Sequence, residues 1–215
     1  MLIDRDGISK HTIHRLALYH SVLKLMQEAG RDLCISGELG RRTGISSHLI
    51  RRDFAYFGEF GIKGVGYKID YLLQRIEKIL GYNTTWNTVL VGLGVPVSYP
   101  AFLAAIEILA VIDLNKQNYG VFIPDLDLAV EAIDNIKEII DSRKITIGII
   151  AVPPAYVQEV ADQLIKSGIK GIVNLSSAPI FAPQSIVITQ LNMASLLSQL
   201  TFALSRPPAE DRRVR

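Results

Sequence analysis

The sequence predicts an α/β protein made of an N-terminal winged helix-turn-helix, a Rossmann-like parallel-sheet domain and a C-terminal helix. Three observations support this fold class. Apolar residues recur at helical spacing through about the first 80 positions. A basic helical segment in that region is followed by four closely spaced glycines. From Trp86 onward, short continuous apolar runs alternate with amphipathic segments, as is typical of buried parallel strands.

The first two helices are predicted from their apolar spacing and their end residues. The stripe of the first helix stops near Gly30 and consists of Ile13, Leu16, Ala17 and Leu23. Ser36 is placed to cap a short second helix, and Thr43, Gly44 and Ile45 form the turn that follows it. These elements are the first part of a helix-turn-helix.

A third helix is predicted after Ser46, which is a favourable N-cap residue. Its apolar positions have helical spacing: Leu49, Ile50, Phe54 and Phe57. The outward face near the helix start carries polar and basic residues, namely Ser47, His48, Arg51 and Arg52. Side chains at the start of such a helix can reach base edges and phosphates in a major groove. This face is therefore a candidate DNA-contacting surface.

A glycine-rich hairpin is predicted directly after this helix. Its glycines allow tight turns and are Gly58, Gly61, Gly64 and Gly66, with Lys63 at the tip. A helix followed by a basic-tipped hairpin is typical of a winged helix and adds Lys63 to the candidate DNA contacts. The alternative is a small three-helix domain whose arginines only face water.

Charge is distributed unevenly along the chain. The whole chain has 23 Lys and Arg against 21 Asp and Glu. Residues 1–80 contain 13 basic and 9 acidic side chains, whereas the remainder contains 10 and 12. The basic surplus thus lies with the predicted DNA-binding domain, as neutralisation of phosphates requires.

The second domain is predicted to follow a helix over residues 69–79. Strands are expected over 88–91, 108–112, 145–152 and 172–173, and helices over 125–144 and 156–167. This order favours a Rossmann-type βαβ architecture. The first strand runs into Gly92-Leu93-Gly94, and Asp113 ends the second strand. In dinucleotide sites such glycines let the backbone approach the pyrophosphate, and the acid binds the ribose hydroxyls.

Two features argue against a standard dinucleotide loop. The third glycine position is Val97, and Pro96 lies inside the loop. The alternative is that Gly92 and Gly94 only form a tight strand-to-helix turn.

An oxidoreductase is disfavoured because all four histidines lie in the N-terminal domain, and no catalytic constellation is evident among lone candidates such as Tyr119, Tyr156 and Lys144. Tyr156 is expected to pack at the start of its helix, and no metal cluster is evident.

Other expectations come from composition. The single cysteine, Cys34, excludes an internal disulfide and favours a reducing cytoplasm, with the thiol filling a gap in the core. No apolar run has the roughly 18–20 residues of a membrane helix, and the start, MLIDRDGISK, has no signal-peptide core. We expect the DNA-binding domain over residues 1–82, the nucleotide-binding domain over 83–190, a C-terminal helix over 191–205 and a disordered tail over 206–215.

Several segments resemble the bacterial redox-sensing transcriptional repressors of the Rex family, over nearly the whole chain. They are RLALYHSVLKL, SGELGRRTGI, IRRDFAYFGEFGIKGVGY, WNTVLVGLG, AVPPAYVQEVAD, SGIKGIVNLS and NMASLLSQLTFAL. The resemblance implies a homodimer with its last helix swapped onto the partner, which binds A/T-rich inverted repeats in double-stranded DNA. It further implies that NADH releases DNA, whereas NAD+ permits binding. The positions that it assigns at or beside the dinucleotide are Gly92, Gly94, Asp113, Val152, Pro153, Asn174 and Ser177.

The chain departs from the family pattern at the redox switch. About four residues are missing between Gly94 and the segment that begins at Tyr99, which is roughly one helical turn. The resemblance implies an aspartate in the closing helix that exchanges partners, pairing either with the residue at Tyr99 or with the residue at Arg15. In this chain the position of that aspartate is Asn192. We therefore predict a Rex-like repressor that responds to NAD(H) with a weakened NADH response. Alternatives are a Rex-like dimer that lost NAD(H) binding or senses another ligand, such as a coenzyme A derivative.

Overall fold

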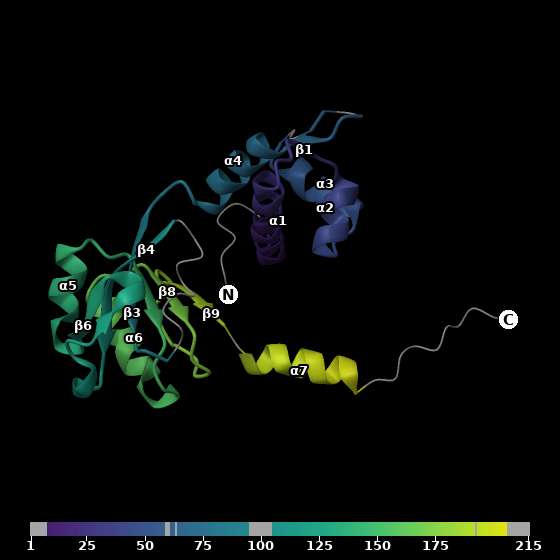
Figure 1. Ribbon diagram of the computed structural model, residues 1–215. Helices are drawn as coiled ribbons and strands as arrows, with labels where there is room; N and C mark the ends of the chain where they lie inside the picture. Colours follow the sequence, from purple (N-terminus) through teal and green to yellow (C-terminus); the bar gives the residue numbers. More distant parts are fainter. Residues whose placement is uncertain (1–7, 59–60, 63, 95–104, 192, 206–215) are drawn as a thin grey trace. The chain divides into compact units, whose positions relative to one another are not determined.

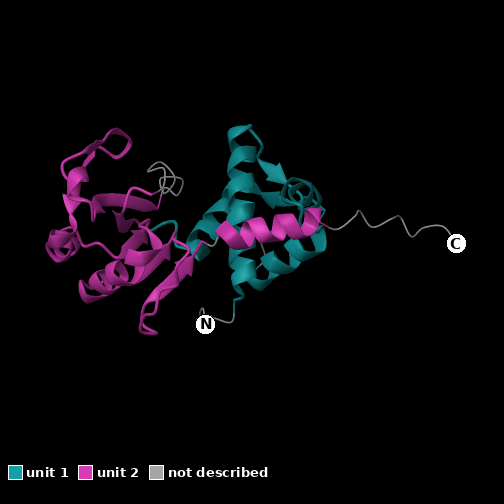
Figure 2. Cartoon of the chain, turned by 90° about the horizontal axis from the view of Figure 1, so that it is seen from below, with its two compact units in different colours: residues 1–84 teal, residues 85–215 magenta. Residues whose placement is uncertain are grey.

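The computed structural model describes residues 8–58, 61–62, 64–94, 105–191 and 193–205. The chain divides into two compact units, Met1–Thr84 and Thr85–Arg215, which Figure 2 shows in separate colours. Figure 1 labels the helices and strands. Each unit has its own hydrophobic core.

Unit 1 is built from four helices and two short strands. They are α1 (Lys10–Glu28), β1 (Leu33–Cys34), α2 (Ser36–Thr43), α3 (Ser47–Tyr56), β2 (Tyr67–Lys68) and α4 (Ile69–Leu80). The predicted N-cap of α3 is confirmed, because the Ser46 side chain accepts a hydrogen bond from the Leu49 backbone N–H. The predicted cap of α2 is wrong. Ser36 is the first residue of the helix, and its N-cap residue is Ile35, which makes no side-chain cap.

The core of unit 1 is formed by residues from α1, α2, α3 and α4. Its largest fully buried side chains include Tyr19 and Phe54, whose rings pack edge to face with centroids 5.4 Å apart. Ile13 was predicted in the α1 stripe but is 37% exposed. Cys34 is buried in this core, as predicted, and burial raises the pKa of its thiol to about 11. Little reactive thiolate therefore exists near neutral pH.

The glycine-rich segment after α3 forms a tight hairpin. Ile62 and Gly66 form an antiparallel bridge, and β1 pairs antiparallel with β2 beside it. Gly66 has φ +111°, and a Cβ added to it would lie 2.5 Å from the Cys34 carbonyl oxygen. This close approach requires glycine. Lys63, the predicted tip residue, lies outside the described residues.

Unit 2 contains a seven-stranded sheet of order β5-β6-β4-β3-β7-β8-β9. The strands are β3 (Trp86–Val91), β4 (Ile106–Asp113), β5 (Phe122–Ile123), β6 (Leu128–Ala132), β7 (Ile147–Ile150), β8 (Gly171–Asn174) and β9 (Val187–Gln190). All the pairings are parallel except that of β5 with β6. The parallel strands follow the doubly wound Rossmann order, which reverses between β3 and β7.

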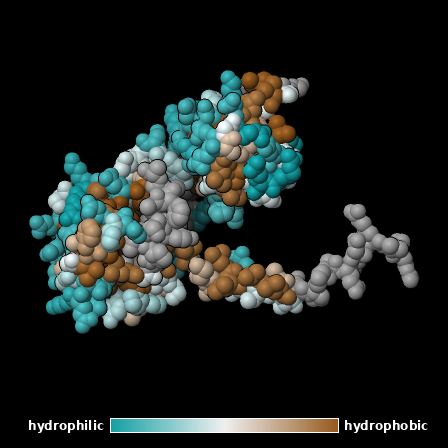
Figure 3. All heavy atoms as spheres, in the orientation of Figure 1, coloured by the Kyte–Doolittle hydropathy of each residue, from teal (hydrophilic) through white to brown (hydrophobic). Residues whose placement is uncertain are grey.

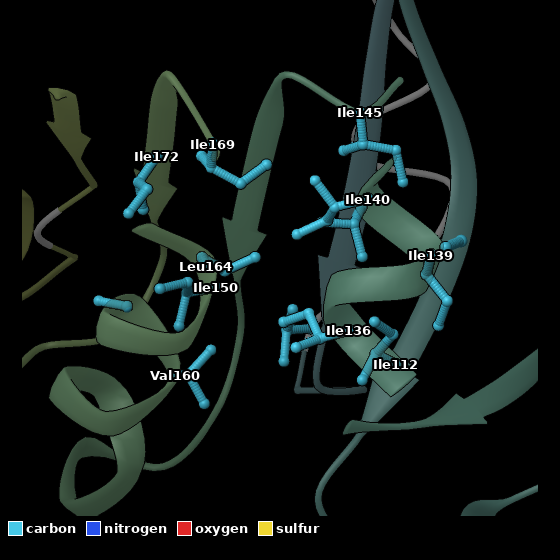
Figure 4. Close-up of a cluster of buried hydrophobic side chains, with 14 of the residues drawn as sticks. Ile112, Ile136, Ile139, Ile140, Ile145, Ile150, Val160, Leu164, Ile169 and Ile172 are labelled. Atoms are coloured by element: carbon cyan, nitrogen blue, oxygen red, sulfur yellow. The ribbon is translucent and has the colours of Figure 1, made fainter. Parts of the chain in front are cut away.

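Two helices cover one face of this sheet. They are α5 (Ile136–Ser142) and α6 (Val157–Lys166). Figure 4 shows isoleucines of α5 and Val160 and Leu164 of α6 pointing toward the same apolar cluster over the strands. On the other face, Leu90, Val111 and Ile149 belong to a second, smaller cluster.

The sheet both confirms and corrects the predicted elements. All four predicted strands are present, with ends shifted by a few residues, and the 156–167 helix is confirmed as α6. The helix predicted over 125–144 is wrong, because Leu128–Ala132 forms β6 and only Ile136–Ser142 is α-helical. Leu and Ala favour helices locally, but pairing with β4 overrides this preference. Strands β5 and β9 were not predicted.

The last described helix, α7 (Met193–Leu204), buries none of its residues. Its apolar side chains colour the helix brown in Figure 3. Five of them occupy positions i, i+3, i+4, i+7 and i+11 and so form one helical stripe: Met193, Leu196, Leu197, Leu200 and Leu204. Each is at least 49% exposed. Such a stripe normally marks an interaction surface.

Candidate functional site

The outward face of α3 is the first candidate surface. His48, Arg51 and Arg52 are exposed on it, and Ser47 is half-buried. The Arg51 Nη1 donates to the Ser36 hydroxyl at 2.9 Å. This bond links the start of α2 to α3 and holds the Arg51 guanidinium at the groove between α3 and the hairpin.

That groove has a volume of about 970 Å³. Its lining includes Ser36 and Arg51 from the helices and Gly61, Gly64 and Gly66 from the hairpin. A basic side chain therefore lies beside exposed backbone, which is an arrangement suited to a polyanionic ligand.

A buried carboxylate fixes the orientation of α3. Asp53, 4% exposed, accepts hydrogen bonds from Arg15 Nε at 2.7 Å and Arg15 Nη2 at 2.6 Å. It also accepts one from the Tyr19 hydroxyl at 2.9 Å. The bond to Asp53 raises the pKa of the Arg15 guanidinium, and burial, aided by Asp53, raises the pKa of Tyr19. Arg15 therefore stays charged and Tyr19 stays neutral near neutral pH, so both keep donating hydrogen bonds to the Asp53 carboxylate.

This network uses Arg15, which was predicted to act in a redox switch. Both of its hydrogen bonds to Asp53 stay within unit 1 and join α1 to α3. The other two predicted switch residues, Tyr99 and Asn192, lie outside the described residues.

The second candidate site is a cavity of about 820 Å³ at the carboxyl ends of the parallel strands. It opens where the strand order reverses, which is where ligands bind in open α/β sheets. Its lining residues come from the ends of β3, β4, β7 and β8 and include Gly92, Gly94, Asp113, Val152 and Pro153. These five residues were predicted from sequence, and the fold brings them together around one cavity.

The glycine turn is set by close backbone contact with the end of β7. The Gly94 N–H donates to the Ala151 carbonyl oxygen at 3.2 Å. A Cβ on Gly92 or on Gly94 would lie 2.5 Å from the same oxygen, and Gly92 has φ +92°. Both positions therefore require glycine. Residues 95–104, which contain Pro96, Val97 and Tyr99, lie outside the described residues.

Asp113 closes the cavity at the end of β4. Its carboxylate accepts from the Asn115 backbone N–H at 2.7 Å and from Asn118 Nδ2 at 3.1 Å. These bonds orient the carboxylate in the cavity wall, where it can accept hydrogen bonds from ribose hydroxyls.

The remaining predicted residues fall elsewhere. Asn174 is fully buried and does not line the cavity. Its Nδ2 donates to the Ala178 carbonyl oxygen, and its Oδ1 accepts from the Ser176 N–H, so it shapes the turn after β8. Ser177 is exposed, and its neighbour Ser176 lines the cavity instead.

Sequence reasoning missed several cavity residues, among them the polar side chains of Tyr156, Glu159 and Ser176. Tyr156 was expected to pack at the start of its helix, but it is 47% exposed and lines the cavity. Its position after the Pro153-Pro154 pair, a few residues beyond the carboxyl end of β7, could have indicated that it lies near the cavity.

The described residues contain no group of three or more potential metal ligands. None of their helices is long and apolar enough to span a membrane.

Family models match part of each unit. Residues 7–55 match the model described as "Putative DNA-binding protein N-terminus", and residues 83–178 match the "CoA binding domain". A redox-sensing transcriptional repressor Rex from Carboxydothermus hydrogenoformans is 36% identical over 93% of this chain and 97% of its own length. The Rex of Pelotomaculum thermopropionicum is 37% identical over 92% and 94%.

The chain belongs to the Rex family. Solved structures of RSP, a Rex-family repressor, agree with this assignment. RSP in complex with β-NAD+ and operator DNA has a TM-score of 0.81 and is 27% identical, with 92% of each chain covered. RSP in complex with β-NADH also gives 0.81, at 27% identity, and covers 92% of this chain. The two-unit Rex architecture is therefore present along the length of this chain.

Gly92→Ala is expected to destabilise unit 2. The added Cβ would meet the Ala151 carbonyl oxygen at 2.5 Å, and the φ of +92° is unfavourable for alanine. We expect a loss of about 1–3 kcal/mol in the free energy of unfolding. Urea denaturation measures it, with Gly171→Ala as the control, because a Cβ there meets nothing closer than 3.8 Å. Equal stability of the two variants would contradict the close approach at the glycine turn.

Proposed function

We propose that this Rex-family protein is a DNA-binding transcriptional repressor that responds to the NADH/NAD+ ratio. The observation that carries the proposal is the cavity at the strand reversal, which combines a glycine turn with an acidic residue ending the second strand of the sheet. The same chain presents arginines on a helix beside a glycine hairpin. RSP, its structural relative, has been solved with NAD+ and operator DNA and with NADH.

The charges of the cavity favour NAD(H) over ligands that carry an additional phosphate on a ribose. The described lining contains the carboxylates Asp113 and Glu159 and no lysine or arginine. A coenzyme A derivative or NADP(H) carries an additional phosphate on a ribose, which these carboxylates would repel. The match to a CoA-binding family model therefore supports the fold of this unit, while the charges support NAD(H) as its ligand.

The ligand is proposed to act as a signal and not as a substrate. Hydride transfer usually needs an acid or base beside the nicotinamide. The described lining offers no histidine or lysine for this role.

For the DNA-binding half, we propose that Ser47, His48, Arg51, Arg52 and Lys63 contact double-stranded DNA. Arg51 and Arg52 follow the start of α3, where side chains reach base edges when a recognition helix enters the major groove. The A/T-rich inverted repeat implied by the family resemblance is the proposed operator. Its two-fold symmetry requires a symmetric protein dimer, which fits a cytoplasmic homodimer built through α7.

NADH is expected to release the protein from an A/T-rich inverted repeat. The test combines calorimetric titration with each nucleotide and a gel-shift assay with NADH, NAD+ or neither. We expect NADH binding with a micromolar or lower Kd and loss of the shifted band, and retention of the band with NAD+. DNA binding that is indifferent to both nucleotides would contradict redox sensing and leave a DNA-binding dimer with another signal.

Arg51→Ala is expected to weaken operator binding by about 1–3 kcal/mol and to relax sequence preference, because a bidentate base contact is lost. Fluorescence anisotropy against operator and scrambled DNA measures both effects. Lys137→Ala, which removes one exposed positive charge from α5, is the control and should leave binding unchanged. An equal loss on both DNA sequences would contradict base reading by Arg51.

Leu197→Asp and Leu200→Asp are expected to dissociate the proposed homodimer. Each leucine is 55% exposed, and burial of one such side chain contributes about 1.5–3 kcal/mol per chain. We expect the dimer dissociation constant to rise at least about tenfold in sedimentation equilibrium. Ser198→Asp adds the same charge outside the apolar stripe and serves as the control. Unchanged dimers in all three variants would contradict an interface through α7.

A further inference from the structure

Ser176 has an unusual environment at the far end of the nucleotide cavity. It follows β8 by two residues, lines the cavity and is 8% exposed. Its hydroxyl oxygen is buried and makes no hydrogen bond. Among the described residues it is the one buried side-chain N or O atom in this condition.

The backbone around this hydroxyl is firmly held. The Ser176 N–H donates to Asn174 Oδ1 at 3.0 Å, and Asn174 is itself anchored to the Ala178 carbonyl oxygen at 2.7 Å. The serine is therefore fixed in place by its main chain, and its side chain is not needed for the turn. Folded proteins rarely leave a buried hydroxyl unsatisfied, because the lost contact with water is not replaced. An unpartnered hydroxyl in a cavity wall is thus available to a ligand.

The strand order indicates which part of a dinucleotide reaches Ser176. Asp113 ends β4 and Ser176 follows β8, and the intervening order is β4-β3-β7-β8. Neighbouring strands lie about 4.8 Å apart, so three intervals separate these residues by roughly 14 Å. With one ribose at Asp113 and the pyrophosphate at the glycine turn after β3, the second nucleoside extends over the ends of β7 and β8.

Resting on the proposed function, we propose that the Ser176 hydroxyl binds the carboxamide of the nicotinamide ring. A carboxamide presents a carbonyl acceptor and an N–H donor, and a serine hydroxyl can pair with either. Ser176 is then a specificity residue that recognises the nicotinamide end of NAD(H). The adenosine end depends on Asp113 and does not involve Ser176.

Two ligands separate these ends in a calorimetric experiment. NADH contains both nucleosides, whereas ADP-ribose contains the adenosine, the pyrophosphate and the second ribose without the nicotinamide. Loss of one neutral hydrogen bond in Ser176→Ala should weaken NADH binding about three- to tenfold. The affinity for ADP-ribose should be unchanged.

A second readout excludes a merely structural role. Because the substitution removes an unsatisfied buried hydroxyl, the ligand-free Ser176→Ala variant should melt at the same temperature as the unsubstituted protein or higher. A serine that supports the fold would show a lower melting temperature and a parallel loss of both ligands. Ser185→Ala, at an exposed position of the same unit, is the control and should change neither quantity.

The outcomes distinguish this inference from the proposed function. Binding of neither NADH nor ADP-ribose by the unsubstituted protein would overturn the proposed function, and the role of Ser176 with it. Equal NADH affinity before and after Ser176→Ala would overturn the role of Ser176 alone, as would an equal loss of both ligands. A selective loss in Ser177→Ala instead would transfer the contact to the neighbouring serine and overturn the assignment.

Discussion

The close approach of two backbones at the ends of β3 and β7 creates the cavity of unit 2. Gly92 and Gly94 lie against the Ala151 carbonyl oxygen at distances that leave no room for a side chain. The sheet order reverses between these two strands, so the chain leaves them in opposite directions and a crevice opens above their carboxyl ends. Asp113 and Ser176 then mark the two ends of the crevice, because their strands lie on either side of the reversal.

Unit 1 depends on a different constraint, which is the neutralisation of a buried carboxylate. Asp53 belongs to α3, and its partners Arg15 and Tyr19 belong to α1. A buried carboxylate without partners is strongly unfavourable, so the two helices keep one relative orientation. The exposed face of α3 is thereby held at a defined angle to α1, and Arg51 is further fixed by Ser36 at the start of α2. Rigid presentation of this kind suits a surface that reads a regular polymer such as DNA.

Much of this arrangement could be predicted from sequence, and the misses have specific causes. The Ser46 cap of α3, the glycines of the hairpin and the apolar periodicity of α1 and α3 are local, and they are found where expected, except that Ile13 is exposed. The segment of β6 was predicted as helix because its Leu and Ala residues favour helices locally. Pairing with β4 in the folded sheet overrides that preference. Ser177 was expected at the cavity, but Ser176 lines it instead. A shift of one residue reverses which side chain faces inward, so a small error in position selects the wrong serine.

The sequence alone determined the two-unit division, the Rossmann character of the second unit and the glycine turn, because these follow from short-range backbone and hydrophobic preferences. The motif indicated Gly92, Gly94 and Asp113, and the resemblance to Rex added Val152 and Pro153; all five line the cavity. Long-range packing was needed for the rest. The pairing of Arg15 with Asp53 spans 38 positions, and the unpartnered hydroxyl of Ser176 exists only once β8 and its turn are folded. Such contacts depend on which distant groups compete for each polar atom, and local propensity contains no information about that competition.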